Sequence, residues 1–373
     1  MMKVAFDIRS LGYTEKRTGV EEYIYNLART FPKIDKKTQF VFFYNHPQNL
    51  FYLKELGEPK NVTLVNLKKN NRLFNFSTKL LGKPKISDFL PFKPDVVLIP
   101  SYRLLALGKG IKRVIVFHDL SFEHFPRFFS LKIRLWHKYI DLKKQARKSS
   151  HLIAVSQSTK NDLVNLYNTV PKKISVVYHG VNLPEINDFE LKKIKEKLPE
   201  KFIFTLSTLE PRKNLKTLIK AFKLLKKEVD LPHKLVVAGK KGWLRKKDLA
   251  LLNHPGIIWL DHISPKEKTA LYKLADIFVL PTYYEGFGLP VLEAMSLGTP
   301  VITTNLSSLP EVTKDSALLI NPHNLEELKN ALKSLLESKN LRSIFKQKGL
   351  KRSKEFNWEK CAKETLKVLK KIA

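Results

Sequence analysis

A single cysteine, Cys361, occurs in the 373 residues of the chain, so an intramolecular disulfide and a thiolate metal cluster are both excluded. No run approaches the roughly 18 consecutive apolar residues that a membrane-spanning helix needs. The first residues, Met2 to Arg9, form too short and too charged a stretch for the apolar region of a signal peptide. From these absences we expect a cytoplasmic protein.

Metal-binding patterns are also missing. The chain contains no D-x-D triplet, and its ten histidines include no H-x-H or H-x-x-x-H pair, so we expect no metal site. Acidic residues are scarce, with 35 against 68 basic residues and a net charge of +33. Such an excess favours polyanions or an anionic membrane surface as partners. A general lysine bias of the genome would give the same charge without any function, and the sequence leaves this choice open.

What the chain does contain is a regular series of short apolar runs. Its length suggests two domains, and its 43% hydrophobic content is typical of a globular protein. Apolar runs that alternate with helical stretches predict parallel strands in two Rossmann-like halves. The predicted strands cover residues 4–8, 40–44, 62–67, 96–99, 113–117, 152–155, 174–178, 202–206, 235–238, 257–260, 275–280, 301–304 and 318–321.

One stretch carries most of the functional information, the run Y-E-G-F-G-L-P-V-L-E-A-M at residues 284–295. A predicted strand precedes it. Pro290 fits the first position of a helix, and Gly298 fits the residue just past the helix end. In a strand, glycine loop and helix unit the helix N-terminus directs N–H groups at the loop, which creates a site for phosphate.

Two carboxylates, Glu285 and Glu293, bracket this loop. A carboxylate is an acceptor with two oxygens and is suited to bind vicinal hydroxyls. One anion-binding helix end with two diol-binding carboxylates predicts a sugar-nucleotide site. Taken as an isolated spacing, the same residues would more often be a glycine turn with two solvated glutamates.

The wider run from residue 275 onward, A-D-I-F-V-L-P-T-Y-Y-E-G-F-G-L-P-V-L-E-A-M-S-L-G-T-P-V-I-T-T-N-L-S-S-L-P-E-V, strongly resembles the retaining glycosyltransferases of family four. Within that family it looks most like the mannosyltransferase-type enzymes of lipopolysaccharide and capsule assembly. The resemblance implies an α/β protein of GT-B fold, with two Rossmann-like domains facing a cleft. It implies an acceptor-binding domain over residues 1–182, a sugar-nucleotide-binding domain over 183–355, and a C-terminal helix over 356–373 that returns to the first domain.

The resemblance also implies a donor site. Glu293 would bind the ribose and Glu285 the hydroxyls of the sugar. The amides around the donor would be those of Gly286, Phe287, Gly288 and Leu289.

Four further positions bear on this site. Arg212 and Lys213, in E-P-R-K-N, match the family's diphosphate-binding pair, and fixed cations there stabilise the departing phosphate most in the transition state. Many relatives carry an arginine six residues before that lysine, where this chain has Ser207. His118, in H-D-L, matches a histidine whose ring can donate to a sugar hydroxyl. Gly19 matches a glycine loop that faces the phosphates of the donor.

The function implied is retaining, metal-independent and cofactor-independent transfer of a hexose, with mannose favoured. The donor would be a nucleoside diphosphate sugar, with GDP-mannose favoured, and the acceptor a lipid-linked or other glycan of the cell surface. A sugar-nucleotide epimerase of the same fold is one alternative, and a polyanion-binding protein is another. No RNA-binding or helix-turn-helix signature occurs, so nucleic acid is not an expected partner.

Two basic stretches bear on membrane contact. Residues 68–83 contain no acidic residue, and residues 130–149 predict one basic amphipathic helix. Such elements are typical of proteins that bind an anionic membrane surface. Residues 68–83 could equally form a solvated loop, and the apolar side of the predicted helix could equally pack on the sheet. The apolar side of the predicted helix consists of Leu131, Leu135, Trp136, Tyr139 and Ile140.

Overall fold

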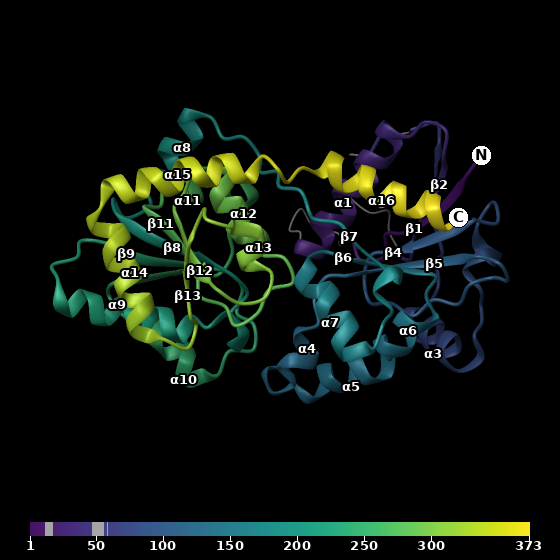
Figure 1. Cartoon of the computed structure of the whole chain (residues 1–373), viewed down its shortest axis with the longest axis horizontal. Helices are drawn as coiled ribbons and strands as arrows, with labels where there is room; N and C mark the ends of the chain where they lie inside the picture. The colour runs from purple at the N-terminus through teal and green to yellow at the C-terminus, as the bar shows by residue number, and fades with distance from the viewer. Residues whose placement is uncertain (12–17, 47–55, 58) are drawn as a thin grey trace. The chain divides into compact units, whose positions relative to one another are not determined.

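The computed structural model describes residues 1–11, 18–46, 56, 57 and 59–373 and divides into two compact units (Figure 1). Unit 1 comprises Met1–Leu120, Leu131–Gly180 and Trp358–Ala373, and unit 2 comprises Ser121–Ser130 and Val181–Asn357. The sequence-based division did not separate Ser121–Ser130, which group with unit 2. The functional roles predicted for the two domains stay predictions.

Unit 1 is built on a seven-stranded parallel sheet in the order β3-β2-β1-β4-β5-β6-β7. Its central strand β4 is buried along its whole length, as expected for a parallel sheet with both faces covered. The strands are β1 (Lys3–Asp7), β2 (Gln39–Tyr44), β3 (Val62–Asn66), β4 (Val96–Ile99), β5 (Lys112–Phe117), β6 (His151–Ala154) and β7 (Ile174–Val176). The described helices are α1 (Gly19–Ile34), α3 (Asn71–Leu81), α5 (Leu131–Ile140), α6 (Leu142–Lys148), α7 (Gln157–Tyr167) and α16 (Trp358–Ile372), with 3-10 turns η1 (Ile86–Phe89) and η3 (Pro171–Lys173).

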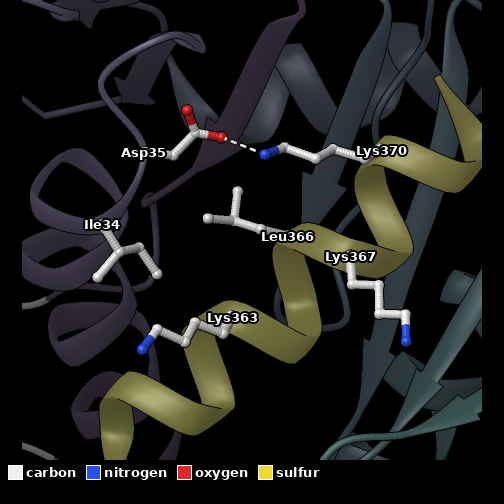
Figure 2. A pocket seen from close by; sticks show the side chains of 6 residues that line it. All are labelled: Ile34, Asp35, Lys363, Leu366, Lys367 and Lys370. Atoms are coloured by element: carbon white, nitrogen blue, oxygen red, sulfur yellow. Dashed lines mark ion pairs between the residues drawn. The ribbon is translucent and has the colours of Figure 1, made fainter.

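The last helix, α16, packs on α1 within unit 1. Figure 2 shows a pocket between them, with Ile34 and Asp35 at the end of α1 on one side and side chains of α16 on the other. Lys370 Nζ lies 2.7 Å from Asp35 Oδ2 across this contact. Asp35 also accepts from the N–H groups of Lys37 and Thr38 and from the Thr38 hydroxyl, so its carboxylate joins three segments of unit 1.

Unit 2 has a six-stranded parallel sheet in the order β10-β9-β8-β11-β12-β13. The strands are β8 (Phe202–Leu206), β9 (Lys234–Ala238), β10 (Ile257–Leu260), β11 (Ile277–Leu280), β12 (Val301–Thr304) and β13 (Leu318–Ile320). The described helices are α4 (Ser121–His124), α8 (Asp188–Lys195), α9 (Leu215–Glu228), α10 (Lys246–Leu249), α11 (Pro265–Leu274), α12 (Leu289–Ser296), α13 (Leu309–Thr313), α14 (Leu325–Glu337) and α15 (Lys339–Ser353), with 3-10 turns η2 (Pro126–Phe128), η4 (Pro211–Lys213) and η5 (Ala250–Leu252).

Side chains of the strands alternate between two cores in unit 2. Ile277 and Val279 of β11 join the core under α9 and α14, whereas Phe278 and Leu280 join the core under α11 and α12. This alternation follows from the two-residue period of a strand. The strand pattern read from the sequence and the α/β fold class are therefore confirmed.

Helix α8 begins with a capping box between Asn187 and Glu190. One predicted segment differs from the structure. Residues 130–149 were expected to form one helix but form two, because Asp141 adopts a left-handed conformation with φ of 53° and its side chain caps α6. Among the helices that the structure describes, none is both long enough and apolar enough to cross a bilayer.

Candidate active site

The candidate site of unit 2 lies where three neighbouring strands end. Strands β8, β11 and β12 are adjacent in the sheet, and their carboxyl ends lead into η4, the glycine loop and residues 305–308. Carboxyl ends of parallel strands share one edge, where α/β proteins bind ligands. Three loops that are distant in sequence therefore meet at this edge.

Charged side chains from two of these loops form a compact cluster. Lys213 Nζ lies 2.5 Å from Glu285 Oε1, and Arg212 Nη1 lies 3.5 Å from Glu285 Oε2. Arg212 Nη2 also donates to Glu210 Oε1 at 2.5 Å. The side chain of Glu285 is only 10% exposed, so the structure brings three predicted site residues together in a largely buried place.

Main-chain contacts hold η4 against the glycine loop. Arg212 Nη1 donates to the carbonyl of Tyr284 at 2.7 Å, and the N–H of Tyr283 donates to the carbonyl of Arg212 at 2.9 Å. The Thr282 hydroxyl donates to the same Arg212 carbonyl at 3.0 Å. These bonds fix Arg212 relative to the glycine loop.

Two serines that sequence reasoning missed hold the backbone of Glu285. Its N–H donates to Ser307 Oγ at 2.9 Å, and Ser308 Oγ donates to its carbonyl at 2.9 Å. Ser307 has a φ of 54°, an uncommon value for a residue other than glycine. The only sequence signal was the S-S pair that follows β12.

Gly288 stands directly before α12 and has a φ of 96°. A Cβ atom at this position would lie 2.6 Å from Leu309 Cδ2, so both the backbone angle and the available space require glycine. Helix α12 begins at Leu289, and Pro290 takes its second position, one residue later than predicted. Gly298, with a φ of 77°, follows the end of the helix as expected.

Glu293 points from α12 to α11. Its Oε1 accepts from Lys268 Nζ at 2.6 Å, and its Oε2 accepts from the hydroxyl of Tyr272 at 3.0 Å. Burial, followed by the nearby Glu293 carboxylate, raises the pKa of Tyr272 well above its ordinary value. Sequence reasoning identified Glu293 but neither of its partners on α11.

His118 follows β5 in unit 1, and its Nε2 lies 2.7 Å from the carbonyl of Pro100. A carbonyl only accepts, so Nε2 carries the proton. Burial lowers the pKa of His118 to about 4, against the opposing effect of the Pro100 carbonyl, so the ring is neutral and Nδ1 is an acceptor. The predicted role was that of a donor to a sugar hydroxyl, which Nδ1 cannot fill.

The ring of His118 packs among aromatic side chains of unit 1. Its centroid lies 5.1 Å from that of Tyr23 on α1 and 5.4 Å from that of His179. These contacts hold the plane of the imidazole.

Gly19 is the first residue of α1, and residues 12–17 of its predicted glycine loop lie outside the described residues. Thr18 and Glu21 form a capping box in which each side chain accepts from the backbone N–H of the other. Glu21 and Glu22 make the first turn acidic, which disfavours an anion at this helix end. The phosphate role of Gly19 stays a prediction.

The segment Ser121–Ser130 packs beside the glycine loop of unit 2. The ring centroid of His124 lies 5.2 Å from that of Tyr284, and the Phe128 ring lies 5.9 Å from the Tyr283 ring. Trp243 Nε1 donates to the carbonyl of Phe128 at 2.6 Å. Sequence reasoning missed this segment, and its only signal was a high density of aromatic residues.

The two Rossmann-like parallel sheets give the chain the GT-B fold. Over its whole length the chain is similar to sucrose-phosphate synthase from Thermosynechococcus elongatus, with a TM-score of 0.74 at 15% identity and coverage of 100% of this chain and 99% of that one. This likeness concerns the fold alone.

Sequence comparisons give the family. The model of the glycosyl transferases group 1 matches residues 187–352, and that of glycosyltransferase family 4 matches residues 17–185. The chain belongs to the glycosyltransferases of family four.

Relatives in this family include two proteins of Escherichia coli. The chain is 29% identical over 272 residues to O-antigen chain mannosyltransferase B. The aligned region covers 69% of this chain and 70% of the relative. The chain is 28% identical over 242 residues to serotype-specific mannosyltransferase WbdA, which covers 60% of this chain and 29% of that longer protein.

Proposed function

We propose that the chain transfers a hexose with retention from a nucleoside diphosphate sugar to a glycan or lipid-linked acceptor in cell-surface glycan synthesis. The observation that carries this proposal is the cluster of Arg212, Lys213 and Glu285 at the edge of the unit 2 sheet. It combines cations for a diphosphate with an acceptor for sugar hydroxyls.

Donor binding exchanges the partners within this cluster. Without a ligand, both cations contact the carboxylate of Glu285. The diphosphate takes over Arg212 and Lys213, which leaves the carboxylate oxygens to accept from the hydroxyls of the sugar. The N–H groups at the start of α12, which follows Gly288, and the amides of Gly286 to Leu289 lie along the same loop.

Glu293 binds the ribose. Each of its oxygens already accepts one hydrogen bond, from Lys268 or from Tyr272, and keeps capacity for another. These two partners hold the carboxylate in one orientation, so that its remaining capacity faces a fixed direction.

The reaction needs no separate base. The bond between the anomeric carbon and the phosphate oxygen breaks, and the acceptor oxygen forms its bond on the same face while its proton passes to the departing phosphate. Arg212 and Lys213 supply the positive charge that stabilises this leaving group, so the transfer is metal-independent. His118 acts through Nδ1 as an acceptor from a hydroxyl of the donor sugar.

Mannose is the favoured sugar and GDP-mannose the favoured donor. The support is that both relatives described above are named mannosyltransferases, and one of them acts on the O-antigen chain. The enzyme works in the cytoplasm, peripheral on the inner face of the cell membrane, where a lipid-linked acceptor is available.

A panel of donors tests the proposal. GDP-mannose, UDP-glucose and UDP-GlcNAc are compared for protection of the full chain against thermal unfolding, because a ligand specific to the folded state raises its stability. We expect GDP-mannose to raise the midpoint most and GDP alone to raise it less. The proposal would be overturned if no sugar nucleotide raised the unfolding midpoint. Formation of an epimerised sugar nucleotide in the absence of an acceptor would instead show that the chain is an epimerase.

A further inference from the structure

The outer face of α3 in unit 1 is apolar. Leu73, Phe76 and Leu80, spaced by three and four residues, and the adjacent Leu81 are 61–74% exposed. Phe74 and Thr78 are buried instead. A surface helix normally buries its apolar stripe. In α3, by contrast, an apolar stripe is left exposed.

Helix α5 has the same property. Leu131, Leu135 and Tyr139, spaced by four residues, and Trp136 are 41–67% exposed. Of the five apolar residues predicted on one side of this helix, only Ile140 is buried. The alternative prediction, that this side of the helix packs on the sheet, is therefore wrong for the four exposed residues.

The two helices contact each other through Tyr139. Lys79 Nζ of α3 donates to the carbonyl of Tyr139 on α5 at 2.6 Å and lies 5.4 Å from the centroid of the Tyr139 ring. The Tyr139 hydroxyl donates to the carbonyl of Asn75 at 3.4 Å. We call the eight exposed apolar residues the α3–α5 surface; they are Leu73, Phe76, Leu80, Leu81, Leu131, Leu135, Trp136 and Tyr139.

Exposed basic side chains lie on these two helices and on the segments that follow them in the sequence, and we call them the basic border. They are Lys79, Lys83, Lys132, Arg134, Lys138, Lys144, Arg147 and Lys148. The single acidic residue within residues 68–83 and 131–148 is Asp141, whose Oδ1 accepts from the N–H of Lys144 as the cap of α6. The border is therefore strongly cationic, with its one carboxylate already engaged.

We propose that the α3–α5 surface docks the enzyme on an anionic lipid bilayer. The basic border binds headgroup phosphates, and the apolar side chains enter the boundary between headgroups and acyl chains. Trp136 and Tyr139 suit that boundary because their rings are amphipathic. The inference extends the proposed function, since it names the part of unit 1 that contacts the membrane of the lipid-linked acceptor.

Other occupants fit this surface less well. Five of its eight residues are leucines, which offer no ring on which a nucleic-acid base can stack. A second copy of the chain would bring two cationic borders together, and like charges repel across an interface. An anionic bilayer matches both the aliphatic centre and the positive border.

Co-sedimentation of the full chain with vesicles tests the proposal. The vesicles consist of phosphatidylcholine alone or of phosphatidylcholine with phosphatidylglycerol. We expect binding to the mixed vesicles only, weakened by salt. A double variant, Leu135→Gln with Trp136→Gln, lowers the partition coefficient about tenfold or more, since both side chains are exposed and their loss spares the fold. A control is Phe189→Gln on α8 of unit 2, an apolar residue that is more exposed, at 78%, than Leu135 or Trp136.

The charge contribution is tested with a second pair of variants. Arg134→Glu with Lys138→Glu lowers the partition coefficient about tenfold or more, because each basic residue near an anionic surface contributes to binding. The control is Lys227→Glu with Lys247→Glu, two exposed lysines of unit 2.

Several outcomes would overturn the docking surface. One is equal binding to neutral and to mixed vesicles. A second is vesicle binding that neither test variant changes. A third is a dimer or an RNA complex that the Leu135 and Trp136 changes disrupt while vesicle binding is unaffected. Sugar transfer to a soluble acceptor is measured in parallel. Loss of vesicle binding with intact transfer separates this surface from the proposed catalytic site, and loss of transfer with intact vesicle binding points to the catalytic site alone.

Discussion

Lys213 and Glu285 lie 72 residues apart in the chain, and their side chains meet at 2.5 Å at the edge of the unit 2 sheet. Neighbouring strands β8 and β11 bring the two loops together. A cation and a carboxylate in such a place neutralise each other, and in the proposed function a donor with phosphate and hydroxyl groups replaces that contact.

Removal of the Glu285 carboxylate tests its role directly. We expect Glu285→Ala to abolish sugar transfer, because the hydroxyls of the donor lose their acceptor, while the circular dichroism of the folded chain is kept. The loss of one such interaction in the transition state costs roughly 3 kcal/mol, or about two decades in kcat. Glu337→Gln, an exposed change on α14, serves as the control. Wild-type rates in the alanine variant would remove the assignment.

Arg212 should not tolerate replacement by lysine. Its guanidinium reaches Glu210, Glu285 and the carbonyl of Tyr284 at once, and an ammonium cannot reproduce this planar fork. We expect Arg212→Lys to lower kcat by about tenfold or more. Steady-state kinetics with the preferred donor measure the effect, and kcat within twofold of wild type would contradict it.

Glu293 should act on donor binding more than on the chemical step, because the ribose is remote from the reacting carbon. We expect Glu293→Gln to raise KM for the donor by about tenfold with kcat little changed. The reason is that the lost hydrogen bond is made equally in the bound ground state and in the transition state. Tyr272→Phe removes only the hydroxyl that orients this carboxylate and should raise KM less. A fall in kcat alone would argue for a different role.

Gly288→Ala should destabilise unit 2. Its φ of 96° disfavours any side chain, and the added Cβ would meet Leu309 Cδ2. We expect a loss of about 2 kcal/mol in the free energy of unfolding, measured by denaturant titration. Gly110→Ala is the matched control, since that residue has a φ of 82° but its added Cβ would meet only Lys93 Nζ, at an ordinary contact distance of 3.6 Å. Equal losses in the two variants would show that the clash with Leu309 contributes nothing.

Asp35 should make unit 1 sensitive to acid. Burial alone would raise its pKa, but hydrogen bonds from Lys370, Thr38 and Lys37 outweigh this effect and lower the pKa from 3.8 to about 2. Because the folded pKa lies below the unfolded one, the stabilisation is complete above the unfolded value and is lost as pH falls from about 4 to about 2.

Asp35→Asn measures this contribution. At pH 7 the variant should unfold with a free energy about 1–2 kcal/mol lower than wild type, because the ion pair with Lys370 is lost. Below pH 2 the difference should disappear, since the wild-type carboxyl is then protonated as well. Thermal unfolding of both chains across this pH range makes the comparison, and a constant difference would contradict it.

The strands and the loop and helix unit around Gly288 could be predicted from the amino-acid sequence alone. Buried parallel strands are continuous apolar runs, and a glycine and a proline mark the start of α12, so both signals are local. The edge of the sheet at which the glycine loop lies followed from the same pattern. Glu285, Arg212 and Lys213 were predicted through the family resemblance, and their meeting at that edge agrees with the order of the strands.

The partners of these residues and the burial of the helix faces in unit 1 depend on contacts between distant segments. Ser307 at the backbone of Glu285 and Lys268 at Glu293 come from other segments, and nothing in the local sequence specifies them. An amphipathic pattern shows that α3 or α5 has an apolar side. It does not show whether that side is covered, because the covering residues come from distant parts of the chain.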